Sequence, residues 1–256
     1  MPRNHHLARI PVEMEYPDEI LGNLINEVFS GEYESGHDGA DLTILDIGAN
    51  IGSFAVWAAL RWPGSTIHCF EANPGTFPYL QRNTRGNPRI HCNHAAVFPG
   101  VERKMTFFSR FAGDGEAGLA TYIGETFRRD LQGHRHEVDV ADPAGLPKAD
   151  IVKLDIEGGE GAVLAALDLS GTALVLCEFQ NRRNRLQMQA TLAKAGFVAV
   201  RDEAAPWDPI LDYKDYNQDL KGDIYGHMFY ARKGQTKLPH ASNAANGAAR
   251  ATTAAG

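Results

Sequence analysis

The segment 46–52 places an acid, two glycines and an amide close together, as Asp46, Gly48, Asn50 and Gly52. Glycine permits backbone angles that other residues avoid, and it lets a ligand approach the main chain. A helix that begins after Gly52 offers free N–H groups and the positive end of its dipole. This combination suits a ligand that carries a carboxylate or a phosphate.

The spacing within this loop separates two classes of nucleotide ligand. A dinucleotide fingerprint has the form Gly-x-Gly-x-x-Gly, whereas Asn50 stands two residues after Gly48. Asp46 would repel a pyrophosphate, but it would attract the cationic amino group of S-adenosylmethionine (SAM). The loop therefore favours SAM, and a nicotinamide dinucleotide (NAD) stays as the alternative ligand.

Two polar residues follow the next apolar run and extend this nucleoside site. Glu71 lies at the spacing from the glycine loop at which an acid accepts hydrogen bonds from ribose hydroxyls. Asn73 follows it and is expected to reach the adenine side of the pocket. Alternatively, Glu71 binds no ligand and is only a solvent-exposed residue at the end of a strand.

A second acidic group comprises Asp155, Glu157 and Glu160, after another apolar run. If the strand persists through them, Asp155 and Glu157 face the same side. Either carboxylate could remove the proton of an acceptor hydroxyl, orient that hydroxyl, or hold a divalent cation that lowers its pKa. Alternatively, Glu160 only favours a helix N-terminus, and Glu157 pairs with Lys153 or with an arginine.

Other polar residues are weaker candidates for a role at the site. Glu178 ends a further apolar run and is expected to contact the acceptor, the molecule that receives a group from the bound cofactor. Histidine titrates near neutral pH, so His94, His134 and His136 are alternative bases, and we assign His136 to the acceptor. An ordinary surface role is the default for each histidine. Tyr33 is expected either to form part of a lid over the site or to pack in the core or on the surface.

These residues need a framework, and the hydrophobic pattern predicts one. Apolar runs typical of strands occupy residues 42–47, 66–71, 89–94, 151–156, 173–178, 197–200 and 224–231, and helical patterns occupy residues 53–61, 74–85, 160–167 and 185–195. Strands that alternate with helices predict an α/β fold, a doubly wound and mostly parallel seven-stranded sheet with helices on both faces. Ligands bind such sheets at the carboxyl ends of the strands.

The pattern also predicts three parts of the chain. Residues 1–40 are expected to be a helical segment packed on the domain, with a helix at 17–29 capped by Asp18. Residues 41–233 are expected to form the main domain, with an irregular, β-rich insertion at 97–150 near the site. A polar loop at 202–223 is expected to form part of a substrate wall. Residues 234–256 have little bulky apolar surface and are expected to be disordered.

Composition limits the possible partners. The net charge of −7 argues against a general nucleic-acid binder. The chain has no run of about 18 apolar residues, so we expect no membrane span, and its N-terminus lacks an apolar signal core, which favours a cytoplasmic location. Cys69, Cys92 and Cys177 lie in apolar stretches and are expected to be buried core residues. Nothing in the sequence indicates the oligomeric state.

Three blocks carry a resemblance to a known family. They are LDIGANIG at residues 45–52, FEANP at 70–74 and VKLDIEGGE at 152–160. In this order they resemble class I SAM-dependent methyltransferases, and more narrowly the FkbM-type family. The resemblance implies a Rossmann-like methyltransferase sheet. It further implies that the aminoacyl end of SAM is lined by Asp46, Gly48, Asn50 and Gly52, that ribose is bound by Glu71, and that adenine is contacted near Ala95.

The resemblance also implies an activity, namely O-methylation of sugars or natural products. The acceptor is then a small molecule or a saccharide, and Asp155 and Glu157 are the candidate catalytic residues, with no metal ligand assigned. Ala72 stands where many family members have proline. Three alternatives stay open: an NAD-linked oxidoreductase, a non-catalytic SAM- or nucleotide-binding module, and nucleic-acid methylation. The acidic charge and the lack of an Asn-Pro-Pro-aromatic segment disfavour the last.

Overall fold

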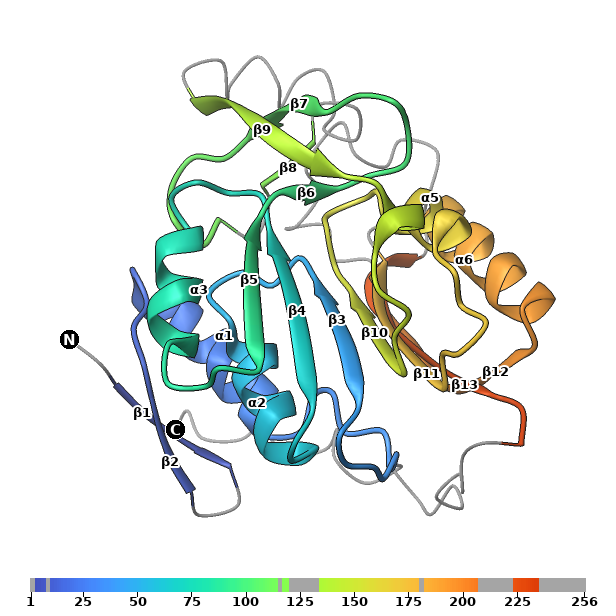
Figure 1. Ribbon diagram of the computed structural model, residues 1–256, viewed down its shortest axis with the longest axis horizontal. Helices are drawn as coiled ribbons and strands as arrows, with labels where there is room; N and C mark the ends of the chain where they lie inside the picture. The colour runs from blue at the N-terminus through green and yellow to red at the C-terminus, as the bar shows by residue number, and fades with distance from the viewer. Residues whose placement is uncertain are drawn as a thin grey trace, which may run out of the picture.

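The computed structural model describes residues 3–7, 10–114, 117–119, 134–179, 182–206 and 223–234. Its centre is a seven-stranded sheet in the order β12-β13-β11-β10-β3-β4-β5 (Figure 1). Within the described part of the chain, β13 is the one strand of this sheet that runs against its neighbours. The doubly wound, mostly parallel sheet expected from the sequence is confirmed.

The strands of the large sheet are β3 (Thr43–Ile47), β4 (Thr66–Glu71), β5 (Ile90–His94), β10 (Ile151–Leu154), β11 (Leu174–Phe179), β12 (Phe197–Pro206) and β13 (Asp223–Arg232). The helices are α1 (Glu19–Phe29), α2 (Ser53–Arg61), α3 (Phe77–Thr84), α5 (Glu160–Ala166) and α6 (Arg182–Lys194). Figure 1 shows α1, α2 and α3 on one face of the sheet and α5 and α6 on the other.

Alternating side chains of the strands feed two separate cores. Ile44 points into the core shared with α1, α2 and α3, whereas its neighbour Leu45 points into the core shared with α5 and α6. This is the period-two alternation of a strand that is covered on both faces. It explains why the strands read as continuous apolar runs.

Helix α1 begins where the sequence predicts it. Asp18 is the N-cap, and its side chain accepts a hydrogen bond of 3.0 Å from the backbone N–H of Leu21. Residues 1–40 hold more than the predicted helical segment. An antiparallel hairpin of β1 (Arg3–Leu7) and β2 (Ile10–Met14) precedes the helix.

Strand β10 is shorter than predicted, and the difference matters for the site. It ends at Leu154, not at residue 156. The backbone cannot stay extended, because Glu157 and Gly158 have φ angles of +60° and +119°. Helix α3 likewise begins at Phe77 and not at residue 74, because a turn occupies residues 74–76.

The insertion forms a four-stranded sheet in the order β6-β9-β7-β8. Its strands are β6 (Ala96–Val97), β7 (Lys104–Phe108), β8 (Gly118–Leu119) and β9 (Arg135–Ala141), followed by the short 3-10 helix η2 (Pro143–Gly145). Because β5 ends at His94 and β6 begins at Ala96, this sheet lies at the carboxyl end of β5 (Figure 1). Antiparallel pairs are present as expected, but β6 and β9 run parallel.

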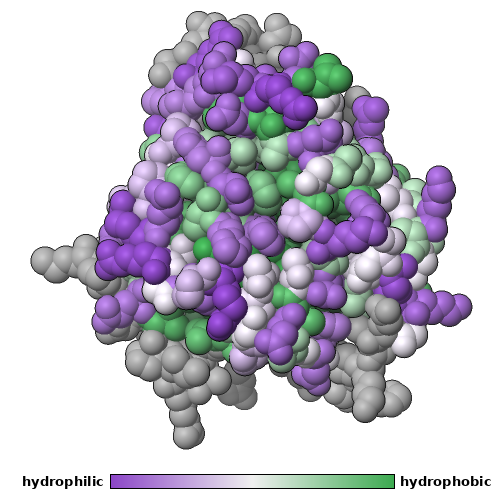
Figure 2. All heavy atoms as spheres, in the orientation of Figure 1, coloured by the Kyte–Doolittle hydropathy of each residue, from purple (hydrophilic) through white to green (hydrophobic). Residues whose placement is uncertain are grey.

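Hydrophobic residues gather between the two sheets on the face shown in Figure 2, with hydrophilic residues around them. The small sheet has its own core of Ala96, Phe107, Ala117, Leu119 and Val138. Most of the predicted substrate-wall loop (residues 207–222) and nearly all of the predicted disordered tail (235–256) lie outside the described residues. Within the described residues, no helix is long and apolar enough to span a bilayer.

Candidate active site

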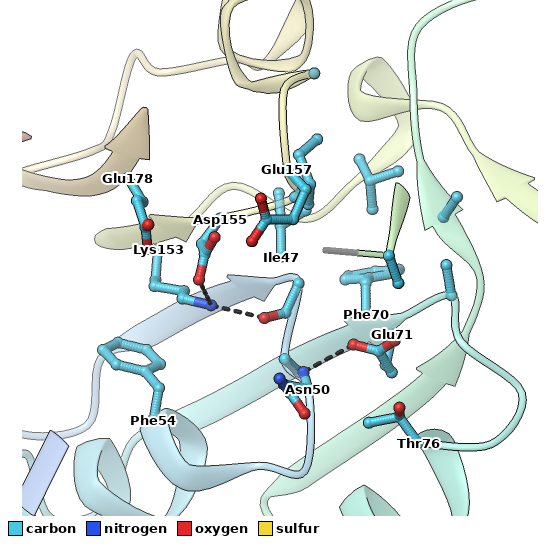
Figure 3. Close-up of a pocket in the computed structure, with 18 of the residues that line it drawn as sticks. Ile47, Asn50, Phe54, Phe70, Glu71, Thr76, Lys153, Asp155, Glu157 and Glu178 are labelled. Carbon is cyan, nitrogen blue, oxygen red and sulfur yellow. Dashed lines mark hydrogen bonds and ion pairs between the residues drawn. The ribbon is translucent and has the colours of Figure 1, made fainter. Parts of the chain in front are cut away.

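A cavity of about 330 Å³ lies at the carboxyl ends of the central strands. Its volume is in the range of small-molecule sites. Figure 3 shows Glu178, Asp155 and Glu157 on one side of it and Glu71 and Thr76 on the other. The predicted site residues that line the cavity are Gly48, Asn50, Glu71, Ala95, Asp155, Glu157 and Glu178.

The loop after β3 forms part of the floor. The backbone N–H groups of Gly48 and Ala49 donate to the carbonyl oxygen of Phe70, at 3.0 and 2.9 Å. Asn50 takes a left-handed conformation with φ +48°, which asparagine tolerates better than most residues. Its buried Oδ1 atom accepts no hydrogen bond from the described residues. The loop therefore presents an unused acceptor at the cavity.

The two glycines of the loop serve contacts within the protein. Gly48 has φ +81°, and a Cβ atom there would lie 1.7 Å from the carbonyl oxygen of Asp155. At Gly52, with φ +91°, it would lie 2.9 Å from the Cδ1 atom of Leu80 on α3. Gly52 does not line the cavity, nor does Asp46. Only Gly48 and Asn50 of the four loop residues have the predicted placement.

A buried lysine joins the loop to β10. The Nζ atom of Lys153 donates a hydrogen bond of 2.6 Å to the carbonyl oxygen of Gly48. It lies 3.6 Å from Asp46 Oδ1. It also lies 3.5 Å from Asp155 Oδ2, an ion pair that Figure 3 shows. Burial opposes the charge of Lys153, but Asp155 and then Asp46 outweigh it and raise the pKa of the lysine. Burial raises the pKa of Asp46, and Lys153 opposes that rise.

Glu71 ends β4 and is buried against the loop. Its Oε2 atom accepts from the N–H of Asn50 at 2.8 Å, and its Oε1 atom accepts from the N–H of Asn73 at 2.7 Å. Burial raises the pKa of Glu71 to about 7, although both hydrogen bonds lower it. Each oxygen keeps a further lone pair that can accept from a ligand hydroxyl.

Asn73 does not line the cavity, so the structure does not support its predicted contact with adenine. Its Nδ2 atom donates to the carbonyl oxygen of Phe111 at 3.0 Å, and its Oδ1 atom accepts from the N–H of Gly75 at 2.9 Å. The side chain thus fixes the turn after β4. Ala95 lines the cavity, next to Ala96.

The opposite end of the cavity is acidic. Asp155, Glu157 and Glu178 face it as the sequence predicts, together with Glu32 and Tyr33. Asp155 and Glu157 do not share a strand face, because β10 has already ended; the left-handed turn at Glu157 brings both to the cavity instead. Their meeting is therefore a property of the turn.

Glu160 has a structural role at the start of a helix, which was the alternative considered from the sequence. It is fully buried at the start of α5 and does not line the cavity. Its Oε1 atom accepts from the N–H groups of Ile156 and Gly158 at 3.0 and 2.9 Å, and the amide of Asn184 donates to its Oε2 atom. The carboxylate holds together the turn that carries Glu157.

Sequence reasoning missed two residues near the acidic end, Glu32 and His227. Glu32 follows α1 and lines the cavity, and His227 of β13 has its Nε2 atom 3.0 Å from Glu32 Oε1. No local motif marks either residue. Tyr33 is buried, and its ring packs edge-on against Phe54 at 5.0 Å between ring centroids. Of its two predicted roles, the structure favours packing in the cavity wall.

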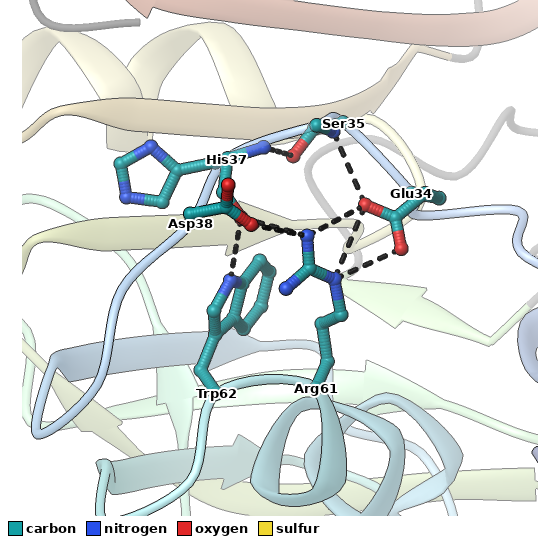
Figure 4. A network of polar contacts seen from close by, with 7 residues as sticks. Glu34, Ser35, His37, Asp38, Arg61 and Trp62 are labelled. Atoms are coloured by element: carbon teal, nitrogen blue, oxygen red, sulfur yellow. Dashed lines mark hydrogen bonds and ion pairs between the residues drawn. The ribbon is translucent and has the colours of Figure 1, made fainter.

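A polar network fixes the loop that carries Glu32 and Tyr33 (Figure 4). Arg61, at the end of α2, donates from Nε and a terminal nitrogen to Glu34, at 2.9 and 3.0 Å. Arg61 and the indole N–H of Trp62 both donate to the carbonyl oxygen of His37. The network therefore anchors the loop to a rigid helix end.

The candidate histidines lie elsewhere. His94, His134 and His136 do not line the cavity. His136 lies on β9, opposite Phe107 of β7, so its assignment to the acceptor finds no support. The ring of His94 stacks on Phe77, 4.6 Å between centroids. Cys69 and Cys177 are buried as expected, while Cys92 is only partly buried.

Comparison with known proteins agrees with this geometry. Residues 46–216 match the model of the methyltransferase FkbM domain. The chain belongs to the FkbM methyltransferase family. A methyltransferase 1 from Beauveria bassiana is 27% identical over 191 residues, covering 66% of this chain and 77% of that protein. The 31-O-demethyl-FK506 methyltransferase FkbM of Streptomyces tacrolimicus is 28% identical over 232 residues, covering 76% and 87%.

Two solved structures illustrate the similarity of this FkbM-family chain to known folds. A precorrin-6y C5,15-methyltransferase from Geobacter metallireducens has a TM-score of 0.41 at 15% identity, covering 85% of this chain and 88% of that chain. The fibrillarin of Aeropyrum pernix, in complex with natively bound S-adenosyl-L-methionine, has a TM-score of 0.40 at 13% identity, covering 75% and 67%.

The residues of this FkbM-family cavity fit SAM, the methyl donor of such enzymes. Asn50 Oδ1 is a buried acceptor without a hydrogen-bond partner among the described residues, as an ammonium ligand requires. Glu71 has acceptor capacity for a ribose diol, and Ala95 and Ala96 contribute small side chains to the cavity wall. When bound there, SAM supplies a methyl group already activated by its sulfonium charge.

The same FkbM-family site gives no support for a bound divalent cation. Within the described residues, no group of three or more His, Cys, Asp and Glu side chains is arranged to hold a metal. The ammonium of Lys153 already lies between Asp46 and Asp155 and supplies a positive charge at that point. A residue of the chain itself therefore neutralises part of the charge of these two carboxylates.

Proposed function

We propose that this protein transfers the methyl group of SAM to a hydroxyl of a small molecule or saccharide, with help from the carboxylates of the cavity. The observation that supports this most is the continuity of the cavity. Gly48, Asn50 and Glu71 lie at one end and Asp155, Glu157 and Glu178 at the other, so donor and acceptor can share one cavity.

The acidic end is suited to an alcohol acceptor. The methyl group of a sulfonium is already electrophilic, so the protein has to align the nucleophile and remove its proton. Carboxylates accept hydrogen bonds from hydroxyl groups and can take up that proton. We assign acceptor contacts to Asp155, Glu157 and Glu178. The relative from Streptomyces tacrolimicus is named for a 31-O-demethyl substrate, which supports an oxygen acceptor.

We assign the donor contacts to Gly48, Asn50, Glu71 and Ala95. Asp46 acts on the donor end through Lys153, which it neutralises in part and which holds the carbonyl of Gly48. Gly52 contributes by packing the start of α2 against α3. In this assignment Asp46 and Gly52 shape the donor site from outside the cavity wall.

The competing functions differ in ligand. A nucleic-acid acceptor would bring phosphates close to several carboxylates, which is unfavourable, so we propose that nucleic acid is not the acceptor. An NAD-linked oxidoreductase would need NAD at the glycine loop. A non-catalytic module would bind SAM without using the acidic end.

Calorimetry and a labelled-methyl screen test the proposal. Titration of the full chain should show SAM binding and negligible NAD binding; tight NAD binding without SAM binding contradicts it. Methyl-labelled SAM incubated with monosaccharides, polyols, phenols and nucleic acids should label a hydroxyl compound. Labelling of nucleic acid alone, or binding of SAM without labelling of any acceptor, favours the competing functions.

A further inference from the structure

Glu178 and His227 form a directly opposed pair on the antiparallel strands β11 and β13. Opposed side chains of such strands interact, and here His227 Nε2 lies 3.9 Å from Glu178 Oε2. The same nitrogen lies 3.0 Å from Oε1 of Glu32, in the loop after α1. His227 thus stands between two carboxylates, both of which line the cavity.

Glu178 and Asp155 differ in their nearest charged partners. The ammonium of Lys153 lies 3.5 Å from Asp155, whereas the imidazole of His227 lies 3.9 Å from Glu178. At Glu178, burial raises the pKa well above the usual range, and the charge of Asp155 raises it further, with Lys153 acting in the opposite direction. A general base is most effective when its pKa is close to the working pH.

The charged and titratable groups around Glu178 come from several elements. They are Lys153 at the end of β10, Asp155 after it, Glu160 of α5, Glu32 and Tyr33 of the loop after α1, and His227 of β13. Lys153 is the one permanent cation of this described set, and Asp46 and Asp155 already share it. His227 lies on the neighbouring strand, with its Nε2 atom 3.9 Å from the Glu178 carboxylate.

We propose that Glu178 accepts the proton of the acceptor hydroxyl, and that His227, which lies between Glu32 and Glu178, is a positioning residue that directs the Glu178 carboxylate into the cavity. This inference rests on the proposed O-methyl transfer. The acceptor oxygen forms a bond to the methyl carbon while its proton passes to Glu178. The carbon–sulfur bond breaks, and its electron pair remains on the sulfur of the donor. The proton then leaves Glu178 for solvent.

A titration that needs no acceptor tests the first part. Glutamate labelled with carbon-13 at the side-chain carboxyl is incorporated into the full chain, and Glu178→Gln identifies the resonance of Glu178. We expect its midpoint to lie well above the ordinary value of 4.5 and to move in His227→Gln. An ordinary midpoint, or one that His227→Gln leaves in place, overturns the inference whatever the activity of the protein.

Kinetics with methyl-labelled SAM and the hydroxyl panel test the second part. Glu178→Gln should lower kcat at least 100-fold and leave the Kd of SAM within threefold, while Glu178→Asp retains part of kcat. His227→Gln should lower kcat about tenfold, shift the pH profile and leave KM nearly unchanged. Glu137→Gln, at an exposed carboxylate of β9, is the matched control and should behave as wild type.

The outcomes distinguish the inference from the proposed function. If the wild type labels no member of the hydroxyl panel, the proposed function fails, and the carboxyl titration still decides the state of Glu178. If the wild type transfers methyl groups and Glu178→Gln does so at the same rate, the proposed function stands and the inference is wrong.

Discussion

The ammonium of Lys153 donates a hydrogen bond of 2.6 Å to the carbonyl oxygen of Gly48. This contact joins residues that lie far apart in the sequence and ties the loop after β3 to the end of β10. The same ammonium is shared by Asp46 and Asp155. One buried cation thus sets the distance between the proposed donor loop and the acidic end of the cavity.

Lys153→Met should remove the hydrogen bond to Gly48 and both ion pairs. It leaves two carboxylates without a counter-charge and a carbonyl without its donor, so unfolding free energy should fall by about 3–5 kcal/mol. The Kd of SAM should rise at least tenfold. Urea unfolding and calorimetry measure both. Lys148→Met, which removes an exposed pair with Asp168, should change neither, and wild-type behaviour of Lys153→Met contradicts the assignment.

Gly48→Ala should show that the turn after β3 requires glycine. The new Cβ atom meets the carbonyl oxygen of Asp155 at 1.7 Å, in addition to the strain of φ +81°. Gly196→Ala is the matched control, because its φ is +84° but no heavy atom lies within 4 Å. Urea unfolding should show a loss of about 1–2 kcal/mol for Gly196→Ala and a clearly larger loss for Gly48→Ala; equal losses contradict the clash.

SAM binding should depend on pH through Glu71. Its pKa is raised to about 7 by burial, so the carboxyl group is mostly protonated at pH 6 and mostly ionised at pH 8. If the ionised form accepts from the ribose hydroxyls, affinity should rise about tenfold over this interval. Calorimetry at several pH values measures the rise. Glu71→Gln should bind SAM more weakly and lose this dependence, and a dependence that survives in the variant assigns it to another group.

The same raised pKa affects the stability of the ligand-free protein. A carboxyl group that ionises near pH 7 when folded, and near 4.5 when unfolded, favours the folded state most below 4.5. Its contribution is lost as pH rises toward 7. Relative to Glu71→Gln, the wild type should therefore lose stability between about pH 4.5 and 7. Urea unfolding of both proteins across this range shows whether the difference has the expected sign.

Asp155→Asn should separate donor binding from transfer. The amide keeps the size of the side chain but removes the charge that faces Lys153 and the cavity. Methyl transfer should fall at least tenfold, with the Kd of SAM within a few-fold. Asp139→Asn, at an exposed residue of β9, serves as the control. Full activity of Asp155→Asn removes this residue from the mechanism.

Chelation should leave methyl transfer unchanged. Lys153 already supplies a positive charge between Asp46 and Asp155, so we propose that the reaction needs no divalent cation. The labelled-methyl assay before and after exhaustive dialysis against a chelator measures this. Loss of activity that a divalent cation restores contradicts the proposal.

Local sequence patterns predicted most of the helices and strands of the main domain. The apolar runs of β3 and β4, the capping residue Asp18 and the period of α2 each report on a few adjacent residues, and the structure agrees with them. The hairpin of β1 and β2 escaped prediction because both strands are short, β1 is largely polar, and β2 contains a proline. The end of β10 was misplaced because a left-handed turn at Glu157 leaves no hydrophobic signal.

The sequence by itself determined the family, the order of the strands along the chain and the residues of the loop after β3, because these depend on residue type and short spacing. Only the tertiary structure decided that Lys153 holds Gly48, that Asn73 and Glu160 are used within the protein, and that Glu32 and His227 meet Glu178. Those contacts join segments that are distant in the sequence, so they cannot be read from neighbours in the chain.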